Sequence, residues 1–477
     1  MKKLLIIAIL APLFYNAQVS FFRSYGGSGN DFGESVLLTS DTCYLVVGAT
    51  ESFGNGATDL YVFKVDSLGE YIWSRTYGGP NIDYGTDAIE MNDGSFLLSG
   101  YSNSGTMGYD FFLVKTSSSG QHQWTKRYGG VDWDLAYSIC KINHSTPGYL
   151  LAGETYSYGA GSTDAYLIKV NELGDTIWTH TYGGANEEVF KEIIEDDYGN
   201  IICIGSTSSN TMYNDSDIWV VKTDSLGNEI WNFTLSDTLD DEGISICLAS
   251  NGNYLIAGND QQPTNVAAYF ASLNTSGSLI YSNEYSGPSD DYSSAILRHQ
   301  DSTSYTLICN SYSFGGGNGY ADILYTQLNG MFAISNLTGL SGTLVEDIST
   351  DADTTADHSI IITGTTRGTL NGMTSVFLLK TDTTYNSFFT ITEDLDLSNP
   401  TSLINYNLTV YPNPAIDYIH LKGISNNDHL YIWDSNGKLI YESKNKHEYI
   451  NIKHLRAGLY FIGTQKFFSK TTCFIKL

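Results

Sequence analysis

Several classes of residue are scarce in this chain of 477 amino acids, and each scarcity excludes a class of protein. Only 24 residues are basic against 52 acidic ones, so the formal charge of −28 argues against nucleic acid as a partner. Proline is rare, with 8 residues, and a chain that is 42% apolar is too hydrophobic for disorder. Beyond the N-terminus no run approaches about eighteen apolar residues, so we expect no transmembrane segment.

The signatures of metal and catalytic sites are also missing. The 6 cysteines form no CxxC pair, so we expect free thiols that act as small apolar residues. The 9 histidines are scattered, and there is no HExxH motif or nucleophile elbow. We therefore assign no catalytic, cofactor-binding or metal-binding residue, although an acid pair for sugar chemistry could be hidden among the many carboxylates.

What the chain does contain is a repeated phrase. "WSRTYGG" at 73–79 returns as "WTKRYGG" at 124–130 and "WTHTYGG" at 178–184, and "FFRSYGG" at 21–27 precedes them. The tryptophans Trp73, Trp124, Trp178 and Trp231 are separated by 51, 54 and 53 residues. Internal periods of about fifty residues are typical of propellers and other repeat arrays.

Each period contains four short runs of aromatic and β-branched residues, separated by Gly, Asn or Asp. Many runs, such as "FFLV" at 111–114, are apolar at successive positions, which indicates burial on both faces of the strand. One such unit cannot cover its own faces, and four strands match one propeller blade. Counting the second runs gives seven units, so we predict an all-β fold with a seven-bladed β-propeller. We expect residues 19–27 to join the last blade beside 376–390 and to close the ring.

The segments "DSLGEYIW" (66–73), "NELGDTIW" (171–178) and "DSLGNEIW" (224–231) resemble the Trp-docking repeats of quinoprotein-type propellers and the Asp-box of sialidase-like ones. The resemblance supports the fold and carries over neither a cofactor nor a catalytic residue.

The two ends of the chain differ from its middle. Residues 1–17 have two lysines before a short apolar run, which predicts a secretory signal peptide cleaved between Ala17 and Gln18. Residues 405–477 hold nine basic and five acidic residues, whereas 18–404 carry a net charge of −34. This shift indicates two units. We place the propeller at 18–392, a linker at 393–404 and a small Ig-like β-sandwich at 405–477.

The C-terminal unit carries an ordered set of motifs: "YPNP" (Tyr411, Pro412, Asn413, Pro414), Asp417, "DSNGK" (Asp434, Gly437, Lys438), "LRAGLY" (Leu455, Gly458, Tyr460) and the final Lys476. In these motifs it resembles the type A C-terminal sorting domain of the type IX secretion system. The resemblance implies that the signal peptide leads the chain into the periplasm and that the secretion machinery then takes it across the outer membrane. Such a domain is usually removed, which leaves a secreted or surface-attached protein.

Acidic residues recur six positions after the Tyr of each phrase or its equivalent: Asp31, Asp83, Asp134, Glu188, Asp241 and Asp291. A ring of carboxylates at one mouth of a propeller would favour Ca²⁺. The alternative is that each carboxylate accepts hydrogen bonds from its own turn. We favour this alternative and expect no cofactor, with calcium as the exception to test.

For function we expect an exported propeller that binds an extracellular glycan, protein or other surface component. The alternatives are an extracellular polysaccharide hydrolase or lyase, and a structural or adhesive surface protein. A pocket with two carboxylates beside exposed aromatic residues would favour the enzyme, and a broad face without one would favour binding.

Overall fold

The computed structural model describes residues 20–476 except 106, 145–146, 210, 212, 214, 236–237, 300–303, 315–319, 329–333, 342–344, 368–372, 382–390, 397–408, 412–417, 423–429, 435–437, 444–448, 457 and 464–470. Throughout these residues the chain forms strands and turns, without a helix. The predicted signal cleavage site at Ala17 and Gln18 lies outside them.

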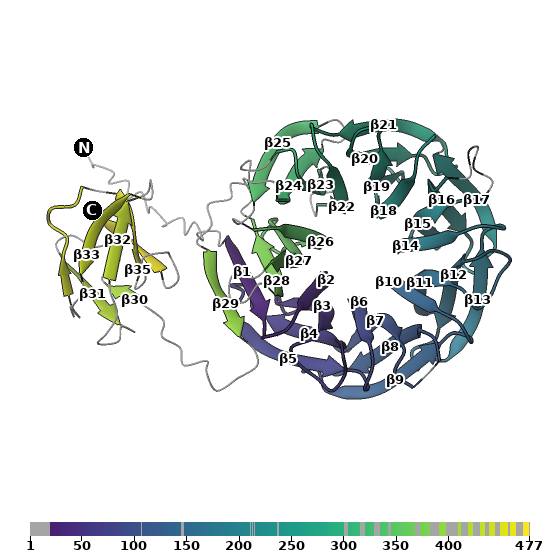
Figure 1. The fold of residues 1–477 in the computed structure, drawn as a ribbon, viewed down its shortest axis with the longest axis horizontal. Helices are drawn as coiled ribbons and strands as arrows, with labels where there is room; N and C mark the ends of the chain where they lie inside the picture. The colour runs from purple at the N-terminus through teal and green to yellow at the C-terminus, as the bar shows by residue number, and fades with distance from the viewer. Residues whose placement is uncertain are drawn as a thin grey trace, which may run out of the picture.

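Seven sheets are arranged around a common centre, as Figure 1 shows along the axis of the ring. Six of them are antiparallel blades of four consecutive strands. Blade 1 consists of β2 (Asp31–Leu38), β3 (Tyr44–Thr50), β4 (Asp59–Val65) and β5 (Tyr71–Tyr77). Blade 2 consists of β6 (Asp83–Glu90), β7 (Phe96–Ser102), β8 (Asp110–Thr116) and β9 (His122–Tyr128). Blade 3 consists of β10 (Asp134–Ile142), β11 (Gly148–Thr155), β12 (Asp164–Val170) and β13 (Thr176–Tyr182). The next three are β14 (Glu188–Glu195), β15 (Ile201–Thr207), β16 (Asp217–Thr223) and β17 (Glu229–Leu235); β18 (Asp241–Leu248), β19 (Tyr254–Gln261), β20 (Val266–Leu273) and β21 (Leu279–Tyr285); and β22 (Asp291–Arg298), β23 (Tyr305–Ser311), β24 (Asp322–Leu328) and β25 (Ile334–Ser341).

The seventh blade is built from both ends of the propeller sequence, and it closes the ring. Its strands lie in the order β26 (Asp347–Thr354), β27 (Ile360–Arg367), β28 (Thr374–Lys380), β1 (Phe21–Gly26) and β29 (Ile391–Asp396). β1 pairs antiparallel with β28, and Phe22 stacks on Phe377 at 5.2 Å. β29 adds a parallel fifth strand on the other side of β1. The prediction of seven blades closed by the N-terminal strand is confirmed.

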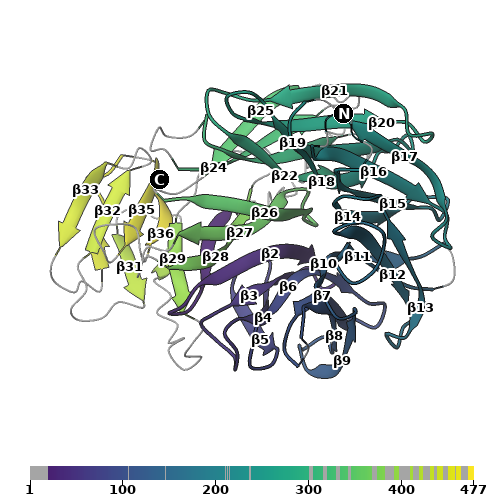
Figure 2. The same cartoon turned by 45° about the vertical axis from the view of Figure 1, so that its right-hand side comes forward.

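Burial follows the position of a strand in its blade. In the second and third strands β3 and β4 every residue is buried, because both faces of the sheet are covered by neighbouring blades. The first strand alternates, as in β2, and the outermost strand β5 is largely accessible. Figure 2 shows the ring turned so that the right-hand side of Figure 1 comes forward, and successive sheets are seen packed face to face.

The repeated phrase holds each blade to the next one. Tyr77, which ends "WSRTY", donates a hydrogen bond through its hydroxyl to the carbonyl of Gly120, 2.5 Å away in the hairpin turn of the next blade. The Trp73 ring lies against the same glycine. The same tyrosine bond recurs between Tyr25 and Gly69 (2.8 Å), Tyr128 and Gly174 (2.7 Å), and Tyr182 and Gly227 (2.6 Å). The phrase is therefore a contact between blades.

The C-terminal unit contains two sheets. One has the order β30 (Thr409–Tyr411), β31 (Tyr418–Lys422), β34 (Tyr449–Asn451), and the other β33 (Leu439–Ser443), β32 (Leu430–Asp434), β35 (Gly458–Gly463), β36 (Thr471–Lys476). Ile419 and Ile450 from the first sheet and Ile432 and Ile462 from the second belong to one buried cluster. This unit therefore has a hydrophobic core of its own.

Candidate functional site

The periodic carboxylates lie at the first residue of the first strand in each blade. All of them are buried: Asp31, Asp83, Asp134, Glu188, Asp241 and Asp291. The seventh blade has Asp347 at this position, which the sequence analysis did not single out. The end of the ring at which these first strands begin is called the start face below. The loops between second and third strands lie at the same end.

Most of these carboxylates accept hydrogen bonds from nearby hydroxyl and backbone N–H groups. Asp31 accepts bonds from Thr50, from Ser52 at 2.7 Å and from the backbone N–H of Gly27 at 2.7 Å. Asp83 has the same kinds of partner in its own blade: Ser102, Ser104 and the N–H of Gly79. This is the arrangement that the turn interpretation predicts. Calcium binding by the ring stays a prediction to be tested.

A second periodic set of aspartates begins the third strands: Asp59, Asp110, Asp164, Asp217 and Asp322. Asp59 accepts bonds from the N–H groups of Asn55 and Gly56 at 3.0 and 2.8 Å. Gly78 lies between this carboxylate and that of Asp83, and a Cβ there would meet their oxygens at 2.4 and 2.6 Å. Only glycine fits, which explains the first glycine of the phrase.

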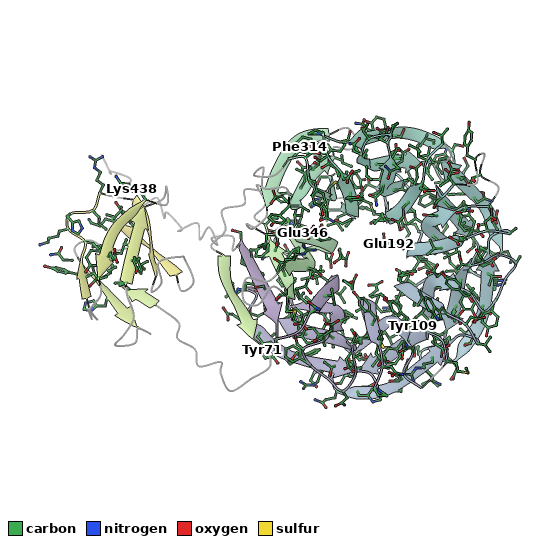
Figure 3. The ribbon with its side chains drawn as sticks, viewed as in Figure 1. Tyr71, Tyr109, Glu192, Phe314, Glu346 and Lys438 are labelled. Carbon is green, nitrogen blue, oxygen red and sulfur yellow. The ribbon has the colours of Figure 1, made fainter. Side chains whose placement is uncertain are left out.

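The centre of the ring holds a cavity of about 340 Å³ lined by the first strands. A β-bulge interrupts each first strand, and the residue after it is Ser35, Asp87, Ser138, Glu192, Ser245, Ala295 or Asp351. Asp351 accepts a bond from the N–H of Val36, Asp87 from Ile139, and Glu192 from Ile246, always in the next blade. Figure 3 labels Glu192 beside the open centre of the ring.

Burial raises the pKa of these channel carboxyls. It raises that of Glu192 to about 7, and that of Glu34, which accepts the Tyr84 hydroxyl, also to about 7. Burial also raises the pKa of Asp87 and of Asp351, and for Asp351 the charge of Asp87 adds to the effect. Asp351, Asp87 and Glu192 accept backbone N–H groups of neighbouring first strands, and Glu34 accepts a hydroxyl of one, so these carboxyls hold the first strands together.

A row of aromatic side chains crosses the start face over blades 1 to 3. The members of this aromatic row are Phe32, Tyr84, Tyr101, Tyr109, Trp133 and Tyr156, with successive ring centroids 5.2–6.2 Å apart. Trp133 and Tyr156 are 52% and 45% exposed. Figure 3 labels Tyr109, which lies over blade 2 between the channel and the rim.

The exposed end of the row is rigid. Tyr109 meets Trp133 edge to face at 90°, and Trp133 meets Tyr156 at 65°. The backbone N–H of Tyr156 donates to the carbonyl of Trp133, and that of Asp134 to the carbonyl of Tyr109, each at 2.7 Å. These two bonds fix the three ring-bearing segments relative to one another.

Tyr156 also lines a hollow of about 530 Å³ over blades 3 to 6, which we call the inner hollow. Its other lining residues are mostly acids, amides and hydroxyls, and Tyr292 is the second aromatic among them. Glu154 accepts the Tyr137 hydroxyl at 2.7 Å, and burial, with a contribution from the charge of Glu187, raises its pKa. The inner hollow therefore combines an exposed aromatic surface with planar polar side chains.

A second hollow of about 580 Å³ begins on the other side of the same loop and runs along β13, away from the start face; it is called the outer hollow. It is lined by Arg127, Tyr128, Gly129, Tyr158, Tyr166, Thr176, Thr179 and Thr181. Tyr158 is 46% exposed and donates its hydroxyl to the carbonyl of Gly129 at 2.8 Å. Among the described residues, none that lines this hollow carries a carboxylate.

Sequence reasoning missed the aromatic row. Trp133 immediately precedes Asp134, and the corresponding residues in blades 4, 5, 6 and 7 are the acids Glu187, Asp240, Asp290 and Glu346. Blades 1 and 2 have Asn30 and Ile82 at this position, so the available signal was an aromatic residue where four of the seven blades have an acid.

The residues of the predicted sorting signal are spread over the C-terminal unit. Leu455 and Tyr460 are in its buried cluster, and the Tyr460 hydroxyl donates to the carbonyl of Arg456. Lys438, which Figure 3 labels, is exposed, and Lys476 is buried. Tyr411 lies in β30, Asp434 in β32 and Gly458 in β35. Pro412, Asn413, Pro414, Asp417 and Gly437 lie outside the described residues.

Residues 409–475 match the family model of the secretion system C-terminal sorting domain. The chain ends in a sorting domain. The protein is therefore cargo of the type IX secretion system, delivered to the cell surface or the medium. The matched segment contains every residue of the predicted sorting signal except Lys476. No helix in the described part of the chain is long and apolar enough to span a bilayer.

Among curated proteins, the regulatory protein FlaEY of Caulobacter vibrioides is 24% identical over 202 residues, which are 36% of this chain and 21% of that protein. The chain thus spans about a fifth of this relative. Similar solved structures include PorZ, a surface component of the type-IX secretion system of Porphyromonas gingivalis (13% identity, 92% of this chain and 68% of that chain, TM-score 0.36). They also include Sqt1 of Chaetomium thermophilum (10%, 75% and 87%, 0.45) and a Bacteroides caccae protein of unknown function (12%, 61% and 91%, 0.38).

Proposed function

We propose that the protein is an extracellular binding module and that its ligand is held on the start face by Trp133 and Tyr156. The observation that carries this proposal is a pair of half-exposed, mutually locked rings at the edge of the inner hollow. A rigid aromatic surface loses little conformational entropy on binding, and a hollow of about 530 Å³ is of the size of ligand sites.

The test uses the full-length chain, fluorescently labelled, and measures its binding to cell envelopes and to extracellular matrix fractions. Trp133→Ala and Tyr156→Ala should each weaken binding about tenfold or more, as expected for central aromatic contacts. Tyr198→Ala is the matched control, because Tyr198 is 80% exposed but lies in the turn between β14 and β15, away from the start face. Equal binding by all three variants would contradict the proposal.

A second candidate function is cleavage of a polysaccharide, either by hydrolysis or by a lyase reaction. Glu154 favours it, because a carboxyl with a raised pKa beside a second carboxylate, Glu187, is what acid–base cleavage of a glycosidic bond requires. Turnover of polysaccharides by the wild type that is abolished in Glu154→Gln, while ligand binding persists, would establish this activity. A wild type that binds saccharides without cleaving them would exclude it for those substrates.

For the C-terminal unit, we propose that its two sheets form an Ig-like sandwich that is recognised by the type IX machinery. The shared core of the two sheets supports this. The proposed recognition residues are those of the sorting signal. Lys438→Ala probes an exposed member, and Leu455→Ala a buried one that affects folding of the unit as well. Export of a reporter fused to residues 405–477 is the measurement, and unchanged export of the Lys438 variant would remove that residue from the signal.

A further inference from the structure

We infer that the protein holds a neutral linear saccharide chain that crosses the loop at 156–163 from the start face to the rim of the ring, with sugar units in both the inner and the outer hollow. This inference rests on the proposed binding function and names its ligand. The two aromatic residues of the loop carry it: Tyr156 lines the inner hollow, and Tyr158, two residues further on, lines the outer one. One loop thus presents an exposed ring to each side.

The loop is held in this shape by several bonds. The Thr155 hydroxyl oxygen accepts the N–H groups of Ser157 and Tyr158, at 3.1 and 3.2 Å. The Ser157 hydroxyl donates to Asp134, and the Tyr158 hydroxyl to the carbonyl of Gly129. The positions of both rings are therefore fixed before a ligand arrives, which lowers the entropic cost of binding.

The chemistry of the inner hollow matches a pyranose. One face of a pyranose ring consists of C–H groups, which pack on aromatic rings, and its rim carries hydroxyls that both donate and accept hydrogen bonds. Tyr156 supplies the apolar surface, and Trp133 packs against its ring at the edge of the hollow. Asn259, Gln261 and Glu187 supply planar donors and acceptors at the wall of the hollow.

The outer hollow offers the same combination in another form. Tyr158 lies 5.7 Å from Tyr166 between ring centroids, and the hydroxyls of Thr176, Thr179 and Thr181 face the same space. Arg127 adds guanidinium donors, and its charge is balanced by Asp83 at 3.7 Å. An uncharged ligand with many hydroxyls fits this lining.

Charge and size narrow the ligand further. The acids Glu154, Glu187 and Asp240 around the inner hollow would repel a polyanionic chain. Each hollow, at about 530 and 580 Å³, lies within the range of about 300–1,000 Å³ that is usual for small-molecule sites. Two such hollows on either side of one loop favour an oligomer over a monosaccharide. The predominantly polar linings also differ from the apolar centre expected of a protein interface.

The experiment measures affinity for neutral glucan, mannan, xylan and galactan oligosaccharides of two to eight sugar units, by calorimetry with the full-length protein. We expect affinity to rise with chain length. Tyr156→Ala should weaken binding of short and long oligomers alike, about tenfold or more. Tyr158→Ala should weaken only the long oligomers, which removes the gain with length. Tyr198→Ala is again the control, and unchanged melting of each variant shows that it folds.

The possible outcomes separate the two proposals. Saccharide binding that is independent of chain length and of Tyr158 would overturn the two-hollow inference and leave the binding function in place. A protein ligand lost in Trp133→Ala, or binding confined to charged saccharides, would overturn the neutral saccharide as ligand. If the envelope binding itself does not depend on Trp133 and Tyr156, the proposed function fails as well.

Discussion

The contact between blades can be tested at Gly120, the hairpin glycine that meets both Trp73 and Tyr77 of the preceding blade. Gly120 has a positive φ of 71°, and a Cβ there would lie 2.7 Å from the Trp73 ring. Gly94 in the same blade has a φ of 76°, but its nearest neighbour is Ser118 at 3.9 Å. Alanine at these two positions therefore meets the same backbone strain and different surroundings.

The structure gives the size of the difference. A left-handed conformation costs a residue with a Cβ roughly 1–2 kcal/mol, which applies to both variants. Only Gly120→Ala must also displace a partly buried tryptophan from its cluster, which costs about 1–3 kcal/mol more. We expect destabilisation of about 2–5 kcal/mol at Gly120 and about 1–2 kcal/mol at Gly94.

Urea unfolding followed by far-UV circular dichroism measures both values, provided that the m-values of the variants agree. A double-mutant cycle isolates the contact, because Gly120→Ala should cost no more than Gly94→Ala once Trp73→Ala has removed the ring. Equal destabilisation by Gly120→Ala and Gly94→Ala in the wild-type background, or the same cost of Gly120→Ala with and without Trp73, would refute the reasoning.

Three further predictions concern the ring. Burial raises the folded-state pKa of Glu34 and Glu192 to about 7, so their protonation stabilises the fold at low pH and this stability is lost as pH rises through about 7. The melting temperature should therefore fall from pH 5 to pH 8, and the double variant Glu34→Gln/Glu192→Gln should show a flatter dependence on pH. An unchanged pH dependence in this variant would contradict the assignment. Because the periodic carboxylates already accept hydrogen bonds, we expect millimolar calcium to leave the melting temperature unchanged, and a shift that is abolished in Asp31→Asn/Asp83→Asn would show the opposite. Cysteines in place of Arg23 and Leu378, which pair across β1 and β28, should form a disulfide detectable by gel mobility, and its absence under oxidising conditions would argue against this ring closure.

The blades could be predicted because each of them repeats the same physical problem. A four-strand unit with two apolar faces must be covered by neighbours, so the same runs return about every fifty residues. The closure was predictable in outline from the early "FFRSYGG". In detail, the structure gives the fourth position of blade 7 to β1 from the N-terminal end and adds β29 outside it as a fifth strand. Periodicity does not reveal which end of a chain supplies a strand.

The candidate site was much less predictable, for a related reason. The pattern singled out Asp31 and its equivalents, whose recurrence reflects a bond that every blade needs. A binding surface on a ring depends on what differs between blades. Trp133 stands out only against the acids at the same position in blades 4 to 7, and Tyr156 meets it through the folding of two separate loops. Distances between loops of different blades are not encoded in any single repeat.

The binding surface itself is tested most directly by hydrogen–deuterium exchange on the full-length protein, with and without the tightest-binding neutral oligosaccharide. The account predicts slower exchange in the segments that carry the exposed rings, 107–111, 131–135 and 156–163, and no change in the turn at 196–200. Protection that spares those three segments, or that appears at 196–200 instead, would contradict it.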